Sequence, residues 1–270
     1  MSCPTVFIEG AALWAPTLPG WGIARAAFRG EGANADPAAR RPAPDMLPPA
    51  ERRRAPDTVA LALEVAAAAV AQSGLNPGEL LSVFSSAHGD LAINDAICSL
   101  LVGTPTLISP TKFINSVLNA ASGYWGIGTG CMQPSTAVSA FDCSFAAGLL
   151  EALTQCAAES RAVLLVGCDI AACGALASTN DSRGLLAVAL VLAPQRSERS
   201  LASLDWSLAA GPTVRLPLRS AAALPLASNA MADALPLFEA LARDDAAPFH
   251  MPLSATLALR ARLGALGRAA

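Results

Sequence analysis

The stretch that decides the fold is Ser109–Ala152, SPTKFINSVLNAASGYWGIGTGCMQPSTAVSAFDCSFAAGLLEA. It predicts a helix over Pro110–Trp125, with proline in its first turn. A strand is expected over Pro134–Ala140, followed by a second helix over Asp142–Glu159. The strand runs directly into that helix, so Asp142 stands at a strand-to-helix elbow.

Helices and strands alternate on both sides of this stretch. We expect a helix over Thr58–Ser73, with Asp57 as its N-cap and Gly74 just past its end, and another over Asp90–Val102. The expected strands are Val6–Ala12, Leu81–Ser85, Ala162–Gly167, Leu186–Leu192 and Ala202–Leu208. This alternation indicates α/β layers.

The pattern is weaker in two other places. Gly30–Pro49 is rich in Ala, Pro, Gly and Arg, which predicts an irregular surface loop. After Pro194 the ordered alternation stops, and a basic helix over Leu253–Arg268 is the main element that we expect there.

The composition is that of an apolar, weakly charged chain. Of its 270 residues 53% are hydrophobic and 14% are charged. The best candidate for a membrane span, Thr58–Ala71, is interrupted by Glu64 and is too short to cross ~30 Å of hydrocarbon. The N-terminus lacks the basic region of a signal peptide. We therefore expect a cytoplasmic protein that buries apolar surface in its core or against a partner.

Charge and cysteine usage exclude further classes. The formal net charge of −3 argues against nucleic-acid binding, which favours a basic surface. The seven cysteines form neither a CxxC pair nor a spacing that would bind a metal together with histidine. We expect free thiols in a reducing compartment, with no metal and no cofactor.

Several motifs, in this order along the chain, resemble the N-terminal half of β-ketoacyl synthases of the thiolase superfamily. The matching positions of the central stretch are Ser109, Pro110, Phe113, Ser116, Asn119, Gly123, Pro134, Ser135, Val138 and Ser139. The resemblance extends to LPPAERRRAPDTVALALEVAAAAV before this stretch and to VLLVGCD and LLAVALVL after it, and so covers about residues 5 to 195. LPPAERRRAP, SSAHGDL and SFAAGLLEA look most like the short ketosynthase-like proteins of aryl polyene gene clusters.

The resemblance implies an α/β fold. Residues 1–195 would form one thiolase-like half, a mixed five-stranded sheet with helices on both faces. Residues 196–270 would form a shortened remnant of the second half, packed on the first. A half without its full mate should leave apolar surface exposed, and such surface calls for a partner.

The resemblance also locates the family's nucleophilic cysteine. Counting eight residues on from Pro134 gives Asp142, and overlaying DCSFAAGLLEA on the family's C-A-S-S-L-x-A-x-x-E-A gives the same residue. Asp142 cannot carry a useful acyl thioester. Its simplest interpretation is an N-cap of the helix that follows. Alternatively, its carboxylate mimics a malonyl carboxylate or promotes decarboxylation.

Cys143 and the two histidines do not restore the missing chemistry. Cys143 lies one residue late, which on an elbow turns the side chain away from a substrate. The family uses two histidines from its C-terminal half to support condensation. His88 lies in the N-terminal half and His250 lacks the family's glycine-rich context, so we interpret both as structural.

The predicted function is a non-catalytic, chain-length-factor-like subunit. It would pair with a catalytic β-ketoacyl synthase in aryl polyene or related fatty-acid-like synthesis, with acyl carrier protein as the substrate of the complex. Pro134 and Val138 would lie at the subunit interface. The candidates for side chains that limit the acyl tunnel are Phe113, Ile114, Val117, Leu118 and Met132; a 3.6-residue period places the first four on one helical face.

Two other functions stay open at this point. The chain could be an independent minimal acyltransferase, ketosynthase or thioesterase that uses Cys143 or Asp142. It could also be a homodimeric acyl-binding module.

Overall fold

The computed structural model describes residues 4–32, 41–211 and 214–266. Its strands are β1 (Val6–Ala15), β2 (Leu18–Pro19), β3 (Leu81–Ser85), β4 (Ser135–Val138), β5 (Val163–Asp169), β6 (Leu186–Ala193), β7 (Ala202–Ala210), β8 (Phe249–Pro252) and β9 (Leu257–Gly264). Its α-helices are α1 (Trp21–Arg29), α2 (Pro49–Arg54), α3 (Asp57–Ser73), α4 (Leu91–Gly103), α5 (Pro110–Asn115), α6 (Ala120–Thr129), α7 (Ser144–Glu159) and α8 (Leu235–Arg243).

One mixed sheet runs through the molecule in the order β4-β3-β5-β6-β1-β7-β9-β8, with β2 paired to β1. The strands β4, β3 and β5 are parallel, and β6 is antiparallel to both β5 and β1. The strands β4, β3, β5, β6 and β1 form the predicted mixed five-stranded sheet, and the thiolase-like fold class is confirmed. The C-terminal strands β7, β9 and β8 lengthen that same sheet. The division at residue 195 stays a prediction.

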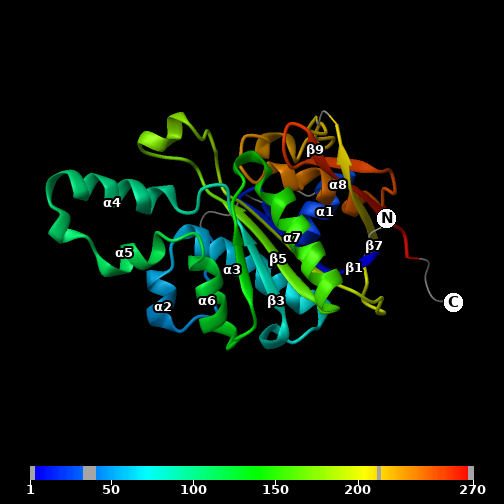
Figure 1. Ribbon diagram of the computed structural model, residues 1–270, viewed down its shortest axis with the longest axis horizontal. Coiled ribbons are helices and arrows are strands. Elements are labelled where there is room, and N and C mark those ends of the chain that lie inside the picture. Colours follow the sequence, from blue (N-terminus) through cyan, green and yellow to red (C-terminus); the bar gives the residue numbers. More distant parts are fainter. Residues whose placement is uncertain (1–3, 33–40, 212–213, 267–270) are drawn as a thin grey trace.

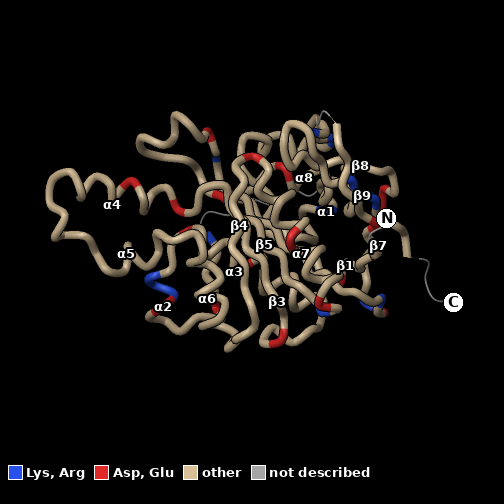
Figure 2. Tube along the Cα trace, in the orientation of Figure 1, with Lys and Arg blue, Asp and Glu red and all other residues tan. Residues whose placement is uncertain are grey.

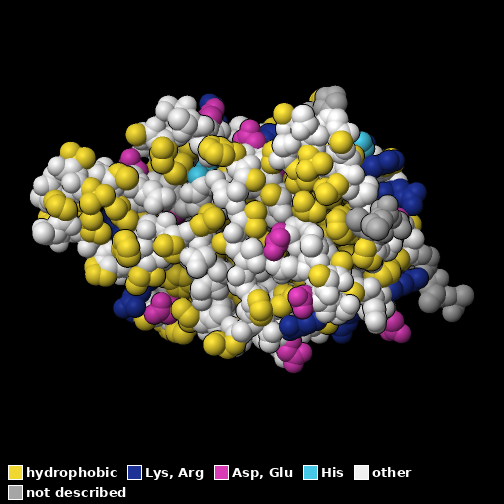
Figure 3. Space-filling view, viewed as in Figure 1, with side chains coloured by type: hydrophobic (Ala, Val, Ile, Leu, Met, Phe, Trp, Pro, Cys, Tyr) yellow, Lys and Arg dark blue, Asp and Glu magenta, His cyan; other side chains and the backbone are white. Residues whose placement is uncertain are grey.

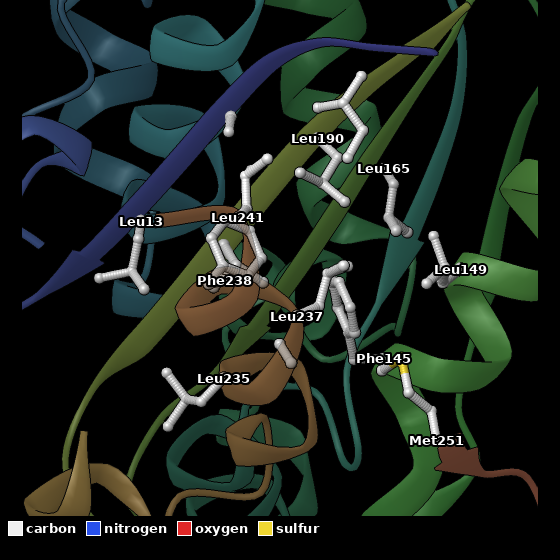
Figure 4. Packing of buried hydrophobic residues seen from close by; sticks show 14 of the residues in the cluster. Leu13, Phe145, Leu149, Leu165, Leu190, Leu235, Leu237, Phe238, Leu241 and Met251 are labelled. Atoms are coloured by element: carbon white, nitrogen blue, oxygen red, sulfur yellow. The ribbon is translucent and has the colours of Figure 1, made fainter. Parts of the chain in front are cut away.

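Helices cover both faces of the sheet, as Figure 1 shows. Alternate side chains of β5 point to opposite faces, so Leu165 joins one core and Leu164 the other. On the face of Leu165 the sheet packs against α7, α8 and α1 (Figure 4). On the face of Leu164 it packs against α3 and α6. All seven residues of β5 are buried, which explains why its sequence is apolar up to the terminal Asp169.

The helix α3 lies across the centre of the sheet and buries ten of its seventeen residues. It packs closely on β1 at Gly10, where an added Cβ atom would come within 2.1 Å of the backbone oxygen of Ala69. The helix ends at Gly74, which adopts the expected left-handed conformation. Asp57 was expected as the N-cap, but Pro56 occupies that position and Asp57 is the first helical residue. Its carboxylate instead lies 3.1 Å from Arg41.

The predicted single helix over Pro110–Trp125 is wrong, because the chain breaks it into α5 and α6. The hydroxyl of Ser116 donates to the backbone oxygen of Phe113 and so ends α5. The side chain of Asn115 donates to the backbone oxygen of Arg54 and holds the break against α2. Val117 and Leu118 follow this break and do not share a helical face with Phe113.

The predicted basic helix over Leu253–Arg268 is also wrong, because β9 occupies Leu257–Gly264. Its side chains alternate, with Leu259 and Ala261 buried while Arg260 and Arg262 are exposed. That two-residue period is a strand period, and it outweighs the high helix propensity of Ala, Leu and Arg. The helices α1 and α2 are elements that the sequence analysis did not predict. Residues 33–40 of the expected loop Gly30–Pro49 lie outside the described residues.

An arm formed by α4 and α5 projects from the body (Figure 1). Charged side chains are sparse along this arm and more frequent on the side of β7, β8 and β9 (Figure 2). Among the described residues no helix combines the length and the apolar character that a membrane span requires.

Candidate functional site

The elbow between β4 and α7 contains a short 3₁₀ turn, η3 (Phe141–Cys143). Phe141 adopts a left-handed backbone conformation, with a φ of 49°, which is uncommon for a residue with a Cβ atom. The buried hydroxyl of Ser144 accepts from the N–H of Ala140 at 3.0 Å and donates to the oxygen of Phe141 at 2.6 Å. These two bonds close the turn and determine where the side chains of η3 point.

Asp142 projects from this turn into solvent, with 73% of its side chain exposed. Its carboxylate lies 3.4 Å from Arg215, and the same guanidinium donates to the backbone oxygen of Asp142 at 2.6 Å. The residue in the N-cap position of α7 is Cys143, and no side chain of η3 accepts a hydrogen bond from the helix. The expectation that Asp142 caps α7 is therefore wrong, because the turn directs its carboxylate away from the helix.

Asp233 takes over that role from a distant segment. It lies in η6 (Ala232–Ala234), and its Oδ2 atom accepts from the N–H of Ala146 at 3.1 Å. Its Oδ1 atom is buried, and the backbone N–H of Phe145 also lowers the pKa of the carboxyl, although less than burial raises it. Burial raises the pKa of Asp233 to about 7. Sequence analysis missed Asp233 because it lies 87 positions from Ala146. The only signal in the sequence was that an acidic residue stands within an apolar segment.

Cys143 is partly buried beside Asp142. Burial raises the pKa of its thiol above the ordinary value, and the negative charge of Asp233 acts in the same direction. The thiolate is the nucleophilic form of cysteine, so these surroundings disfavour the reactive state at neutral pH.

His88 belongs to a buried cluster at the ends of β3 and β5. The carboxylate of Asp169 accepts from the hydroxyl of Ser86 at 2.6 Å and from the N–H of Ala87 at 2.9 Å. The Nδ1 atom of His88 lies 3.8 Å from this carboxylate and 3.1 Å from the oxygen of Gly89. Burial raises the pKa of Asp169. These contacts support the structural interpretation of His88. His250 lies instead on β8, with its side chain exposed.

The five tunnel candidates lie in two settings. Val117 and Leu118 line a narrow pocket together with Phe84, Asn115 and Cys168, which we call the gauge pocket. Phe113, Ile114 and Met132 do not line it; all three are exposed large apolar side chains.

Exposed apolar residues concentrate around these candidates. Ten of the sixteen exposed large apolar residues of the described chain lie between positions 101 and 141. We call these ten the apolar belt: Leu101, Val102, Leu107, Phe113, Ile114, Val117, Leu118, Ile127, Met132 and Phe141. Figure 3 shows much apolar surface over the α4–α5 arm.

The strand β4, which carries Pro134 just before it and Val138 at its end, forms an open edge of the sheet. The oxygen of Pro134 accepts from the N–H of Ser82 in β3, and the oxygen of Val138 accepts from the N–H of Ser86 just after it, so alternate residues face β3. The backbone groups of Ser135 and Ala137 consequently face the open side. An unpaired strand edge is a template for pairing with another chain.

Comparisons with known proteins agree with this fold. The family model described as "Beta-ketoacyl synthase, N-terminal domain" matches residues 29–247. A comparison with curated protein sequences gives no match.

Three solved structures are similar over nearly the whole chain. One is a chain of "Ketosynthase (ApeO) in Complex with its Chain Length Factor (ApeC) from Xenorhabdus doucetiae", with 23% identity, a TM-score of 0.71 and coverage of 96% of this chain and 99% of that one. A chain of the ishigamide ketosynthase/chain length factor has 16% identity, a TM-score of 0.71 and coverage of 97% and 100%. A chain of the AntDE:AntF complex of a ketosynthase with acyl carrier protein has 10% identity, a TM-score of 0.72 and coverage of 96% and 99%.

Proposed function

The chain belongs to the β-ketoacyl synthase family, and from this membership we propose that it is a non-catalytic, chain-length-factor-like subunit. It pairs with a catalytic β-ketoacyl synthase subunit in the cytoplasm, and acyl carrier protein delivers the substrates of the complex. The pathway is aryl polyene or related fatty-acid-like synthesis. The similarity to structures that contain ketosynthases with their chain length factors supports this proposal.

The elbow supports a non-catalytic role. Condensation by this family needs a thiol that carries the acyl chain, and the corresponding position holds Asp142. The neighbouring thiol of Cys143 has a raised pKa, which disfavours its thiolate. His88 lies in the buried cluster with Asp169, and His250 is exposed on β8. His88 comes from the N-terminal half and His250 lacks the glycine-rich context of the family's condensation histidines, and both observations support the proposed non-catalytic role.

The observation that carries the pairing proposal is the open edge of β4, which Met132 and Phe141 of the apolar belt flank in the chain. The outward backbone groups of Ser135 and Ala137 supply hydrogen bonds for a partner strand in antiparallel pairing. The apolar belt supplies the buried area that a stable interface requires. The partner is a chain of the same fold, whose equivalent strand presents the same edge.

The gauge pocket gives the subunit its second role. Val117 and Leu118 belong both to the apolar belt and to the gauge pocket. An acyl chain that crosses the interface would meet these two side chains first. They would end the partner's acyl tunnel and so limit the length of the product.

Co-expression with a catalytic synthase subunit tests the pairing. The chain should co-purify with it in a 1:1 complex. Ala137→Pro removes an outward N–H and adds a ring at the open edge, so it should abolish the complex. Ala137→Val keeps the N–H and suits a strand, so it serves as the control and should pair normally. A stable complex with Ala137→Pro would contradict pairing through β4.

A further inference from the structure

The C-terminal strands β7, β9 and β8 are covered on only one face. Their inward side chains, among them Leu204, Leu259 and Met251, belong to the core that contains residues of α7, α8 and α1. The core on the other face of the sheet, under α3 and α6, includes no residue of these three strands. An antiparallel sheet can leave one face to water. Within the described chain, these strands therefore present an uncovered face at the end of the sheet opposite β4.

Three donor side chains form a row across this uncovered face. Arg260 of β9 lies opposite Ser207 of β7 and opposite His250 of β8. Directly opposite residues of antiparallel strands point to the same face, with their Cβ atoms ~4.5–5.5 Å apart. Arg260 is exposed, so all three side chains point outward. We call these three residues the donor row.

The donor row has no partner among the described residues. The side chains of its three members form no hydrogen bond or ion pair with any described residue. The neighbouring arginine differs, because Arg262 lies 3.1 Å from the carboxylate of Asp205 and forms an ion pair with it. Hydrogen bonds from Thr5 and Arg262 lower the pKa of Asp205, and the charge of Arg262 offsets that of the carboxylate. Within the described chain, the guanidinium of Arg260 is left without a counter-charge.

A hollow of about 570 Å³ lies beside the donor row. Arg260 and Ser207 line it, together with Thr5, Ala246 and Pro248. A hollow of this volume holds a small organic molecule. Its lining combines a cationic group and hydroxyls with small apolar side chains. Such a lining favours a ligand that has an anionic end and a compact organic part.

A phosphate group suits the donor row better than a carboxylate does. A phosphate monoester presents three terminal acceptor oxygens, and the row offers a guanidinium, an imidazole N–H and a hydroxyl. A carboxylate has only two oxygens, both in one plane, and would leave one donor of the row unused. Hydrogen bonds from an arginine to a phosphate are charge-assisted and are among the stronger ones in proteins.

We propose that the donor row is a binding site for a small phosphate monoester. Arg260 binds the phosphate oxygens, Ser207 and His250 donate to the same group from the neighbouring strands, and the organic part lies in the hollow. Binding is reversible, and no bond to phosphorus forms or breaks. The row shares no residue with the gauge pocket or the apolar belt, so the inference does not rest on the proposed function.

The chain has only two histidines, and they provide a direct measurement. In the full chain, labelled at its histidine rings, titration with glycerol 3-phosphate at constant pH and ionic strength should shift the ring signals of His250 saturably. The side chain of His88 is 7% exposed, so its ring signals should stay unchanged and serve as an internal control. His250→Gln assigns the two sets of signals.

Succinate, titrated in the same way, tests the carboxylate class and should bind at least about tenfold more weakly than glycerol 3-phosphate. No saturable shift of the His250 signals with the phosphate ester would overturn the proposal. Equal shifts at both histidines, or equal binding of succinate, would overturn it too.

Matched variants locate the site. Arg260→Gln and Arg53→Gln remove the same charge, but Arg53 is an exposed residue of α2, outside the donor row. Arg260→Gln should weaken binding at least about tenfold, whereas Arg53→Gln should change it less than about twofold. Equal effects of the two substitutions would show general charge attraction and contradict the site.

Asp205→Asn should have the opposite effect. It removes the carboxylate that pairs with Arg262, so a second guanidinium becomes available beside the donor row and a negative charge is lost. Glycerol 3-phosphate should bind about threefold more tightly or better, measured by the same His250 signals. Weaker binding in this variant would count against phosphate recognition on this face.

Discussion

Arg215 holds Asp142 by two contacts, a hydrogen bond of 2.6 Å to its backbone oxygen and an ion pair of 3.4 Å to its carboxylate. The two residues are 73 positions apart. The contact joins the elbow at the family's nucleophile position to the C-terminal segment. The elbow is thus stabilised from outside β4 and α7, and its geometry depends on the chain beyond residue 195.

The structure separates the stability effects of two acids at this elbow. Asp142→Ala removes an exposed ion pair, which is worth ~0–1 kcal/mol. Asp233→Ala removes the acceptor of the Ala146 N–H, and a lost cap of this kind costs ~0.5–2 kcal/mol. Urea unfolding at pH 5.5, where Asp233 is mostly protonated, should rank Asp233→Ala as the less stable variant. The opposite order would restore Asp142 as the cap.

Restoring the nucleophile alone should not restore catalysis. Asp142→Cys places a thiol at the elbow, but neither His88 nor His250 has the sequence context of the family's condensation histidines. We expect no β-ketoacyl product from the purified variant chain with malonyl and acyl carrier protein. The catalytic partner subunit, assayed with the same substrates, is the positive control. Condensation by the wild-type chain alone, lost in the Asp142 variant, would refute the non-catalytic role.

Asp233 should make stability depend on pH. In the unfolded chain its pKa is ~4, whereas burial raises the folded value to about 7. Between these values the unfolded chain has released a proton that the folded chain retains, so stability falls as the pH rises. The effect is complete above the folded pKa. Below the unfolded pKa both states are protonated and the effect is absent.

Asp233→Asn removes this titration and keeps an acceptor for the N–H of Ala146. From pH 4.5 to pH 7.5 the wild type should lose ~2–4 kcal/mol of unfolding free energy relative to this variant. Other titrating groups are common to both proteins and cancel in the difference. Parallel pH profiles would show that Asp233 is ionised in the folded chain.

The gauge pocket gives a prediction about product length. Val117→Ala and Leu118→Ala should lengthen the product of the reconstituted pair, and a tryptophan at either position should shorten it. Met132→Trp is the matched control, since Met132 is exposed and lies outside the gauge pocket. Mass spectrometry of the released chains measures the outcome. Unchanged products in a folded complex would mean that this subunit does not measure the chain.

Two glycines provide a test of packing. Gly10→Ala would bring a Cβ atom within 2.1 Å of the oxygen of Ala69, and overpacking against backbone should cost ~3 kcal/mol or more. Gly22 in α1 has no atom within 4 Å of the corresponding position. Gly22→Ala should be neutral or stabilise by up to ~1 kcal/mol. Thermal unfolding of both variants measures these stability changes. An unchanged stability in Gly10→Ala would show that α3 can move away from β1.

The sheet was predictable wherever its strands are buried on both faces. Val163–Cys168 and Leu186–Ala193 carry no charged residue and lie between turn signals, so local sequence suffices to identify them. β9 was misread because its alternation is carried by Ala, Leu and Arg, which favour helices. The break after Asn115 depends on a hydrogen bond to Arg54, 61 positions away, which local periodicity does not contain.

The candidate site divides in the same way. The position of Asp142 followed from counting along a strand and a helix that both exist. Asp233 could not be found by counting, because its role arises from a contact between segments far apart in the chain. The gauge pocket likewise depends on the break between α5 and α6. The sequence therefore included Val117 and Leu118 among five tunnel candidates, but it could not distinguish them from the three that lie outside the pocket.

The position of β1 in the sheet has a consequence for synthesis on the ribosome. β1 is made first, yet it pairs with β6 at Phe7 and Ala193 and with β7 at Val6 and Leu204. The ten residues of β1 therefore have no β6 or β7 to pair with until about two hundred residues have been translated. Such long-range pairing slows folding and leaves a strand open to aggregation or chaperone binding. The completed sheet, and with it the elbow held by Arg215, can form only after most of the chain has left the exit tunnel.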